Sequence, residues 1–276
     1  MLRQILQRLI PRIQQMLGPD APFELEWVSV YQFACRRIDR FRHGRVLFAG
    51  DAAHQVSPFG ARGANTGVQD VDNLAWKLGL VLDGAAPEAL VDSYHDERAF
   101  AADDNLLNST RSTDFITPKS RASLRLRNAV LELAASEPFA RPLINSGRLS
   151  TPTPYRDSPL NTEDESPFAG KLLPGTNAAD APVQVNGRDA WLLGQLGDGF
   201  TLLSFGPAAA VACGSVNAQV LSVGLDIVDR AGVLTERYDG RPGTVYLLRP
   251  DQHVAARWRS FDAGKIEAAL RRCLSL

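Results

Sequence analysis

Residues 45–78, RVLFAGDAAHQVSPFGARGANTGVQDVDNLAWKL, contain the strongest structural signal in the chain. The apolar run at residues 46–49 predicts a short strand that is buried on both faces. Gly50 and Asp51 follow it directly, at the carboxyl end of a strand, where open α/β sheets bind their ligands. A glycine-rich loop then leads into an amphipathic helix predicted at about residues 65–82. The segment is therefore predicted to be a strand–loop–helix unit with a ligand at its turn.

The start of this predicted helix is suited to a negatively charged ligand. Three glycines keep side chains away from it, namely Gly60, Gly63 and Gly67. The backbone N–H groups of Ala64 and Asn65 would then point at the ligand, and a helix N-terminus carries partial positive charge. A reduced flavin carries negative charge at one end of its isoalloxazine ring and would suit this position. The carboxylate of Asp51 accepts hydrogen bonds only, which suits a ligand hydroxyl.

This segment resembles the second FAD-binding motif of the class A flavoprotein monooxygenases, the para-hydroxybenzoate hydroxylase family. It is most similar to the branch of phenol hydroxylases and 3-(3-hydroxyphenyl)propionate hydroxylases. The matching residues are Gly50, Asp51, Ala52, Ala53, His54, Pro58, Gly60, Gly63, Asn65, Gly67, Asp70, Asn73, Leu74, Trp76, Lys77 and Leu78. A weaker match extends through Tyr94, Glu97 and Arg98.

The resemblance implies a role for each position of a cofactor site. Asp51 would bind the ribityl chain of FAD, and Pro58 would lie beside the flavin ring. The backbone at Ala64 and Asn65 would hydrogen-bond the pyrimidine end of that ring. The implied cofactor-binding residues are Gly50, Asp51, Pro58, Gly60, Gly63, Ala64 and Asn65.

Other candidate residues are less defined. Tyr31 and Phe33 lie on a strand predicted at residues 23–33, where they would either line a substrate pocket or belong to the core. Asp51 and His54 have a DxxH spacing, but no further ligand lies nearby, so we predict no metal site and a local hydrogen bond for His54. No residue stands out as a general base, and the catalytic residues stay unassigned.

The resemblance also implies an activity, the hydroxylation of a phenolic ring with NAD(P)H and O2, in which FAD supplies the redox chemistry. The family opens with a strand–GxGxxG–helix unit that holds the ADP part of FAD, and it has a middle DG motif. Neither motif has a counterpart in the sequence. We therefore expect the carboxy-terminal part of such an enzyme, with weak or no FAD binding and no activity alone. The open alternative is a non-catalytic remnant that acts as an association module, with a homodimer as one form.

The carboxy-terminal third has a different character. Residues 202–205, LLSF, and 248–258, LRPDQHVAARW, resemble the thioredoxin-like third domain of the larger hydroxylases in this family. Residues 206–209, GPAA, stand where a working thioredoxin has its CxxC, and Cys213 is alone, so we expect a redox-silent domain. The expected domains are 1–148, the carboxy-terminal part of the FAD-binding and substrate domains, a linker at 149–169, and a thioredoxin-like domain at 170–276.

The predicted fold class is therefore mixed α/β. It comprises a partial FAD-binding hydroxylase fold without its amino-terminal Rossmann unit, followed by the thioredoxin-like domain. Apolar spacing predicts a helix at residues 1–17. Further helices are predicted from near residue 87, at residues 94–108 and, as a terminal helix, at about 264–274. Further strands are predicted at 201–205, 219–228, 244–248 and 253–258. On the helix at 65–82, Lys77 is predicted to face solvent.

Composition excludes several classes of partner. The chain has 276 residues, 45% hydrophobic and 22% charged, with a net charge of -1. That charge gives no field suited to nucleic acid or to an anionic membrane, and no apolar run is long enough for a membrane span. The three cysteines are far apart, which argues against disulfides and zinc sites and favours the cytoplasm.

Overall fold

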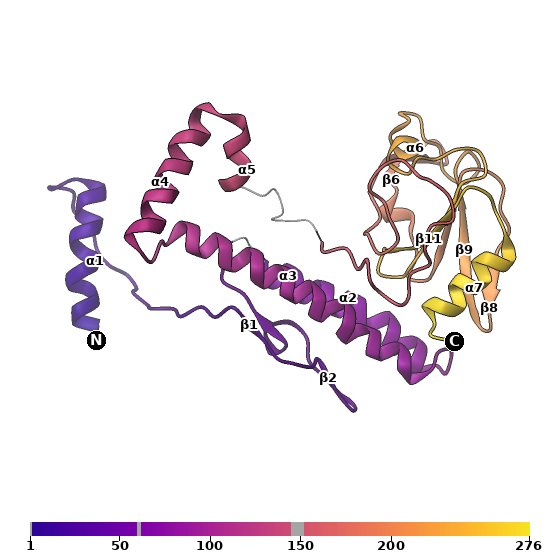
Figure 1. Ribbon diagram of the computed structural model, residues 1–276, viewed down its shortest axis with the longest axis horizontal. Coiled ribbons are helices and arrows are strands. Elements are labelled where there is room, and N and C mark those ends of the chain that lie inside the picture. The colour runs from indigo at the N-terminus through magenta and orange to yellow at the C-terminus, as the bar shows by residue number, and fades with distance from the viewer. Residues whose placement is uncertain (1, 60–61, 145–151) are drawn as a thin grey trace. The chain divides into compact units, whose positions relative to one another are not determined.

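The computed structural model describes residues 2–59, 62–144 and 152–276. It divides into two compact units, Met1–Gln32 and Phe33–Leu276, and each is described by itself. The fold is mixed α/β, as the sequence predicted, and Figure 1 shows the elements in chain order.

The first unit consists of helix α1 (Leu2–Leu17) and an irregular tail. The apolar residues of α1 recur at three- and four-residue steps, which gives the helix one apolar side, and Gly18, at φ +106°, follows its last residue. The strand predicted at residues 23–33 is wrong, since no strand is assigned there. A strand is stable only when its backbone groups pair with a neighbour, and none of the strands in the described residues pairs with this stretch.

The second unit begins with short antiparallel strands around the Gly50 turn. β1 (Arg36–Arg37) pairs with β4 (His54–Gln55), and β2 (Arg42–His43) pairs with β3 (Val46–Leu47). A 3₁₀ helix, η1 (Gly50–Ala52), lies between β3 and β4. The prediction of a strand buried on both faces at residues 46–49 is wrong, because β3 pairs only within a hairpin and Val46 is 55% exposed.

Two long helices form the body of this half. α2 (Gly63–Leu82) and α3 (Asp92–Ile116) pack against each other and are connected through η2 (Glu88–Val91), and they run side by side in Figure 1. Both long helices were predicted, and α2 ends at its predicted residue. Three shorter helices follow, α4 (Arg121–Ser136), η3 (Pro138–Ala140) and α5 (Arg141–Ile144).

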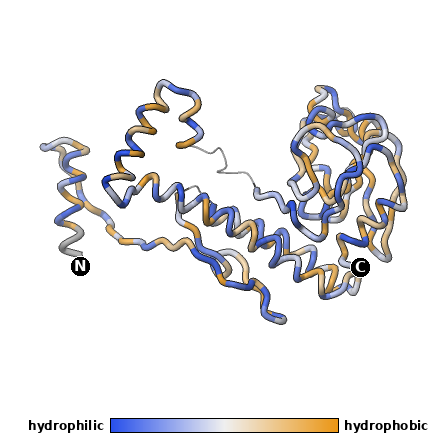
Figure 2. The backbone as a smooth tube through the Cα atoms, viewed as in Figure 1, coloured by the Kyte–Doolittle hydropathy of each residue, from blue (hydrophilic) through white to orange (hydrophobic). Residues whose placement is uncertain are grey.

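The buried side of α2 differs from the prediction. Its apolar residues were expected to face the core, yet Val68 is 69% exposed and Val71 is also exposed. The fully or nearly fully buried side chains of the helix are polar, namely Thr66, Asp70, Asn73 and Lys77. The prediction that Lys77 faces solvent is therefore wrong. Figure 2 shows hydrophobic and hydrophilic positions alternating along the long helices. Helical spacing alone could not indicate which side is buried.

The carboxy-terminal part contains seven strands and three helical segments among residues 152–276: β5 (Pro182–Val185), β6 (Arg188–Trp191), η4 (Leu193–Gln195), β7 (Thr201–Ser204), β8 (Val211–Cys213), β9 (Val216–Ser222), α6 (Val233–Arg237), β10 (Val245–Leu248), β11 (Val254–Trp258) and α7 (Ala263–Cys273). Strands β5 and β6 form a hairpin of their own. The other five form one sheet in the order β11-β10-β7-β9-β8, in which β7 and β9 are parallel and all other neighbours antiparallel.

The predicted strands and terminal helix of this part are present as β7, β9, β10, β11 and α7, although β9 ends at Ser222, earlier than expected. The sequence reasoning missed β5, β6 and β8. Parallel neighbours need a crossover connection, which is usually a helix. Between β7 and β9 the connection contains the edge strand β8, on which Cys213 is buried.

Hydrophobic residues cover the two faces of this sheet in two separate clusters. Leu202 and Leu247 belong to one cluster, while their neighbours Leu203 and Tyr246 belong to the other. The first cluster also contains residues of α7, and Trp76 of α2 packs against it. Helix α2 is therefore in direct contact with the carboxy-terminal sheet. The predicted domain boundaries stay a prediction, since residues 145–151 lie outside the described part of the chain.

Candidate functional site

The turn at Gly50 is held very close to helix α2. Gly50 has φ +57°, a conformation that favours glycine, and a Cβ placed on Gly67 would lie 3.4 Å from the Cα of Gly50. A Cβ at either position would therefore be in van der Waals contact with the other glycine, which shows how closely the turn and the helix pack. Asp51, the next residue in η1, has an exposed side chain.

Helix α2 begins at Gly63, slightly before its predicted start. The Thr66 N–H donates to the Arg62 carbonyl at 2.9 Å. The first N–H groups of an α-helix, such as those of Gly63 and Ala64, have no acceptor within the helix itself. Ala64 is exposed, as is Asn65. The first turn of α2 therefore presents backbone donors at the surface.

The remaining predicted site residues are placed as follows. Pro58 is exposed on the loop before α2, and Gly60 lies outside the described residues. Tyr31 belongs to the first unit and Phe33 opens the second, with side chains 64% and 59% exposed. Neither is a core residue, so the core alternative for this pair is wrong, and their substrate role stays a prediction.

Asp70 is the central acceptor beneath the turn. Its Oδ2 accepts the Gly50 N–H at 2.8 Å and lies 2.8 Å from His54 Nε2, while its Oδ1 accepts from Arg98 Nε at 2.6 Å. Burial alone raises the pKa of Asp70, but the hydrogen bond to His54 and the charge of Arg98 outweigh burial and lower it. Asp70 is therefore ionised at neutral pH, and it fixes the backbone of the turn to α2. The predicted local hydrogen bond of His54 is confirmed.

A second set of polar contacts fixes the start of α2 to α3. Arg62 donates to Asn105 Oδ1 at 2.6 Å, Asn105 donates to Thr66 Oγ1 at 3.2 Å, and the Thr66 hydroxyl donates to the Arg62 carbonyl at 2.6 Å. Arg98 also donates to the Thr66 carbonyl, at 3.1 Å. All these side chains are buried. The buried side of the first turn of α2 is thus attached to α3, while Ala64 and Asn65 lie on its exposed side.

The sequence reasoning assigned no role to Asp70, Asn105 or Arg98. Asp70 and Arg98 were among the residues that matched the family, yet their partners lie 20 and 28 positions apart in the chain. A hydrophobic pattern carries no information about such pairs. The available signal was the position of Asp70, since it lies on the same side of the helix as Thr66 and Lys77.

The site as described fits one part of FAD. An exposed carboxylate at Asp51 lies on a turn packed against the exposed first turn of α2, and a carboxylate and a helix N-terminus suit the ribityl hydroxyls and the flavin ring. The diphosphate of FAD would need further donors, and the sequence has no GxGxxG loop. The residues present therefore fit the flavin end of the cofactor.

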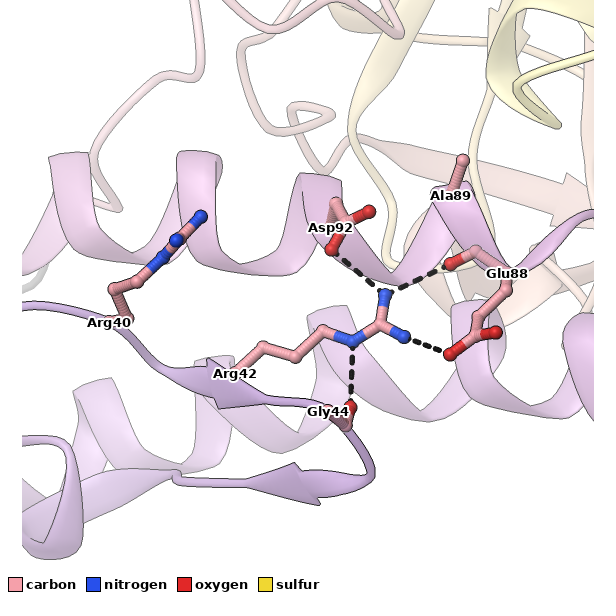
Figure 3. Close-up of a pocket in the computed structure, with 6 residues that line it drawn as sticks. All are labelled: Arg40, Arg42, Gly44, Glu88, Ala89 and Asp92. Atoms are coloured by element: carbon pink, nitrogen blue, oxygen red, sulfur yellow. Dashed lines mark hydrogen bonds and ion pairs between the residues drawn. The ribbon is translucent and has the colours of Figure 1, made fainter.

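A separate surface pocket of about 420 Å³ lies between the β2–β3 hairpin and the start of α3, as Figure 3 shows. Arg42 donates to Asp92 Oδ1 at 2.9 Å, to the Gly44 carbonyl at 3.0 Å and to Glu88. Both carboxylates are exposed, so these pairs contribute little stability. With its guanidinium already engaged by two carboxylates, Arg42 is not available for an anionic ligand.

Two further features bear on the kind of site. Within residues 2–59, 62–144 and 152–276 no group of His, Cys, Asp or Glu side chains is arranged to hold a metal ion. None of the helices described is both long and apolar enough to cross a membrane.

Comparisons with known proteins agree with this geometry. Residues 3–109 match the family model of the FAD binding domain. The proteins to which the whole chain is similar are flavin-dependent monooxygenases of aromatic compounds, in agreement with this match. The resemblance predicted from residues 50–78 is thereby confirmed.

Three individual proteins illustrate how similar the chain is to known monooxygenases. The 4-methyl-5-nitrocatechol 5-monooxygenase of Burkholderia sp is 32% identical over 93% of this chain and 48% of its own length. Among solved structures, the flavin-dependent monooxygenase PieE with FAD and substrate has a TM-score of 0.77 at 25% identity, over 97% of this chain and 54% of its own. Aklavinone-11 hydroxylase with FAD and aklavinone has a TM-score of 0.75 at 29% identity, over 98% and 51%. The chain thus spans about half the length of these proteins.

Proposed function

We propose that this chain supplies the flavin end of the cofactor site in an FAD-dependent monooxygenase that hydroxylates a phenolic ring with NAD(P)H and O2. The observation that carries the proposal is the Gly50 turn, which Asp70 holds against the open first turn of α2. The relatives whose printed names describe nitrocatechol and aklavinone oxidation support an aromatic substrate.

In this proposal each residue has a positioning task. Asp51 accepts a hydrogen bond from a ribityl hydroxyl, and Gly50 lets the backbone approach the cofactor. The N–H groups of Ala64 and Asn65 hydrogen-bond the pyrimidine end of the ring, where the helix N-terminus favours negative charge. Pro58 lies beside the ring and, together with Gly60 and Gly63, completes the cofactor-binding set. When bound, FAD supplies the electron transfer and the activation of oxygen.

The chain alone is proposed to be inactive, with FAD bound weakly. The ribityl and ring contacts are available, whereas no GxGxxG loop holds the diphosphate. Tyr31 and Phe33 are the proposed substrate contacts. A reducing cytoplasm is the proposed location, since Cys35, Cys213 and Cys273 are all free thiols.

The test is an FAD titration of the purified chain, followed by flavin fluorescence anisotropy, with Asp51→Ala as the variant. Removing a hydrogen bond to a charged group costs about 1.5–3 kcal/mol, so Asp51→Ala should weaken FAD binding by about 10- to 100-fold. Asp83→Ala is the matched control, because Asp83 is also an exposed aspartate but lies beyond the opposite end of α2.

Asp83→Ala should bind FAD like the unmodified chain. Equal weakening by the two substitutions would mean that only net charge matters and that the Asp51 role is mistaken. Absence of any FAD binding at high concentration, in the unmodified chain, would contradict the proposed flavin site.

A second candidate function is an association module without catalysis. Apolar side chains are exposed on the short helices after α3, among them Leu126, Phe139 and Leu143, and apolar surface of this kind is typical of interaction sites. Gel filtration separates the two candidates. A stable homodimer that binds no FAD favours association, and FAD binding that depends on Asp51 favours the flavin site.

A further inference from the structure

A fully buried cluster of charged residues joins α2 and α3 to the carboxy-terminal sheet. Arg249 donates to the two carboxylate oxygens of Glu97 at 2.6 and 2.9 Å. Arg249 also donates to both carboxylate oxygens of Asp251, at 2.9 and 2.5 Å. From α2, Lys77 donates to Glu97 at 2.7 Å, and Asn73 donates to Glu97 at 2.7 Å and to Asp251 at 3.0 Å.

The charges in this cluster balance, with two cations and two anions. None of the four charged side chains is more than 1% exposed. The aromatic ring of Trp76 lies 5.3 Å from the Arg249 guanidinium and 5.6 Å from Lys77 Nζ, positions in which it stabilises both cations. The cluster is therefore complete only when α2, α3 and the residues after β10 are all in place.

The cluster is continuous with the contacts that hold the Gly50 turn. Asp70, Asn73 and Lys77 follow one another along the buried side of α2. On α3, Glu97 of the cluster is adjacent to Arg98, which binds Asp70. The turn at one end and the carboxy-terminal sheet at the other are thus attached to the same side of one rigid helix.

A second connection runs beside the first. Arg98 donates to the Tyr155 hydroxyl at 2.7 Å, and the Tyr155 ring stacks on His253 with centroids 4.5 Å apart. His253 Nδ1 lies 2.8 Å from the Asp251 carbonyl. The His253 ring is buried within this connection.

We propose that Arg249 and Asp251 are positioning residues for the Gly50 turn, so that the carboxy-terminal domain sets the position of the flavin-binding residues through α2. This assignment gives the carboxy-terminal domain, which has no CxxC, a structural role in positioning the Gly50 turn. Buried ion pairs stabilise a fold less well than apolar contacts of the same size, but bidentate arginine pairs fix geometry closely. A cluster of this composition is therefore better suited to fixing the position of α2 than to stabilising the contact between α2 and the sheet.

The inference rests on the proposed function in one respect only, namely that the Gly50 turn binds flavin. Its test needs no flavin, so failure of this test and failure of the proposed function are distinguishable. The measurement is amide hydrogen exchange by mass spectrometry on the full chain, which compares peptides covering η1 and the first turns of α2 with peptides covering β7 and β10.

The variants are Arg249→Met, which removes the charge, and Arg249→Lys, which keeps the charge but loses the bidentate geometry. In Arg249→Met the turn peptides should exchange about tenfold faster or more, while the sheet peptides keep their rates. Arg249→Lys should be intermediate. The matched control is Arg259→Met, because Arg259 lies in the same domain and pairs with Asp239, away from α2. It should leave the turn peptides unchanged.

Unchanged turn peptides in Arg249→Met would overturn the proposal. So would an equal acceleration of turn and sheet peptides, because that result indicates a loss of global stability alone. If Arg249→Met does not fold, Asn73→Ala decides the matter by the same two criteria. That substitution removes the two bonds that Asn73 donates to Glu97 and Asp251, while Lys77 keeps its bond to Glu97 and all four charges stay in place.

Discussion

At the scale of single residues, Lys77 is the residue whose surroundings are most unusual. It is fully buried, and its ammonium group donates to Asn73 Oδ1 at 2.9 Å and to Glu97 Oε2 at 2.7 Å. Burial lowers its pKa to about 8, although the nearby charge of Glu97 opposes that shift. The nearby charges of Glu97 and Asp251 both favour its protonated form.

This lowered pKa predicts how stability depends on pH. The unfolded chain keeps the Lys77 proton up to the ordinary pKa of 10.5, whereas the folded chain releases it at about 8. Between these values the unfolded state binds more protons, so the free energy of unfolding rises with pH. Relative to Lys77→Met, the unmodified chain should gain up to about 3 kcal/mol across this range.

Urea unfolding of both proteins at pH values between 7 and 10.5 measures the difference. Lys119→Met is the control, since the Lys119 side chain is 80% exposed, and it should follow the unmodified chain at every pH. A constant difference between the unmodified chain and Lys77→Met would show that the proton on Lys77 is held equally in both states.

At the scale of elements, the crossover between β7 and β9 distinguishes the carboxy-terminal sheet from a working dithiol domain. The edge strand β8 is part of this connection, and its Cys213 is buried. Residues 206–212, between β7 and Cys213, contain no second cysteine. Burial also raises the pKa of Cys273, on α7, to about 12. Thiolates are the reactive form of cysteine, so this helix presents an inert thiol.

The expected outcome is a chain without thiol–disulfide exchange activity. Insulin reduction with dithiothreitol should proceed at the rate without protein, since a single thiol cannot form the internal bridge that exchange requires. Ellman's reagent should label exposed Cys35 in the native chain, and the two buried cysteines only after unfolding. Turnover that disappears in Cys213→Ser would contradict this expectation.

The elements themselves were largely predictable from the sequence, and the reason is local. Apolar spacing indicated α2, β7, β10, β11 and α7 because apolar residues recur in each of them with the period of that element. The strand expected at residues 23–33 failed, since a strand also needs a neighbour, which no local pattern reveals. The strands β5, β6 and β8 were missed because they are short and partly exposed.

The candidate site was predictable to a smaller extent. The motif indicated the turn at Gly50 and a helix from about residue 65, slightly after its start at Gly63, because glycines and a following apolar pattern are visible in the chain. The contacts that hold the turn were invisible, since Glu97 and Arg249 meet only in the folded chain, 152 positions apart. A buried lysine on a helix has the same spacing as an exposed one, which is why Lys77 was placed wrongly.

At the scale of the whole molecule, the described chain contains the Gly50 turn, which is the proposed flavin site, and the carboxy-terminal sheet. We expect the purified protein to be colourless, with FAD far below one per chain. Hydrogen bonds to the diphosphate contribute about 1.5–3 kcal/mol each, and several are lost without a GxGxxG loop, so affinity should fall by orders of magnitude. Absorbance of stoichiometric flavin after gel filtration would contradict this.

The pairing of Glu97 with Arg249 also has a consequence during synthesis. A ribosome releases the chain from the amino end, so Lys77, Glu97 and the Gly50 turn emerge long before Arg249 does. Until then Glu97 lacks its bidentate partner, and the charged side of α2 must stay in water, because burying unpaired charge is unfavourable. We therefore expect α2 and α3 to stay only partly assembled until the segment that contains Arg249 has been synthesised. A stop codon after residue 98 and before Arg249 would leave a product that keeps residues 45–78 but lacks the arginine partner of Glu97.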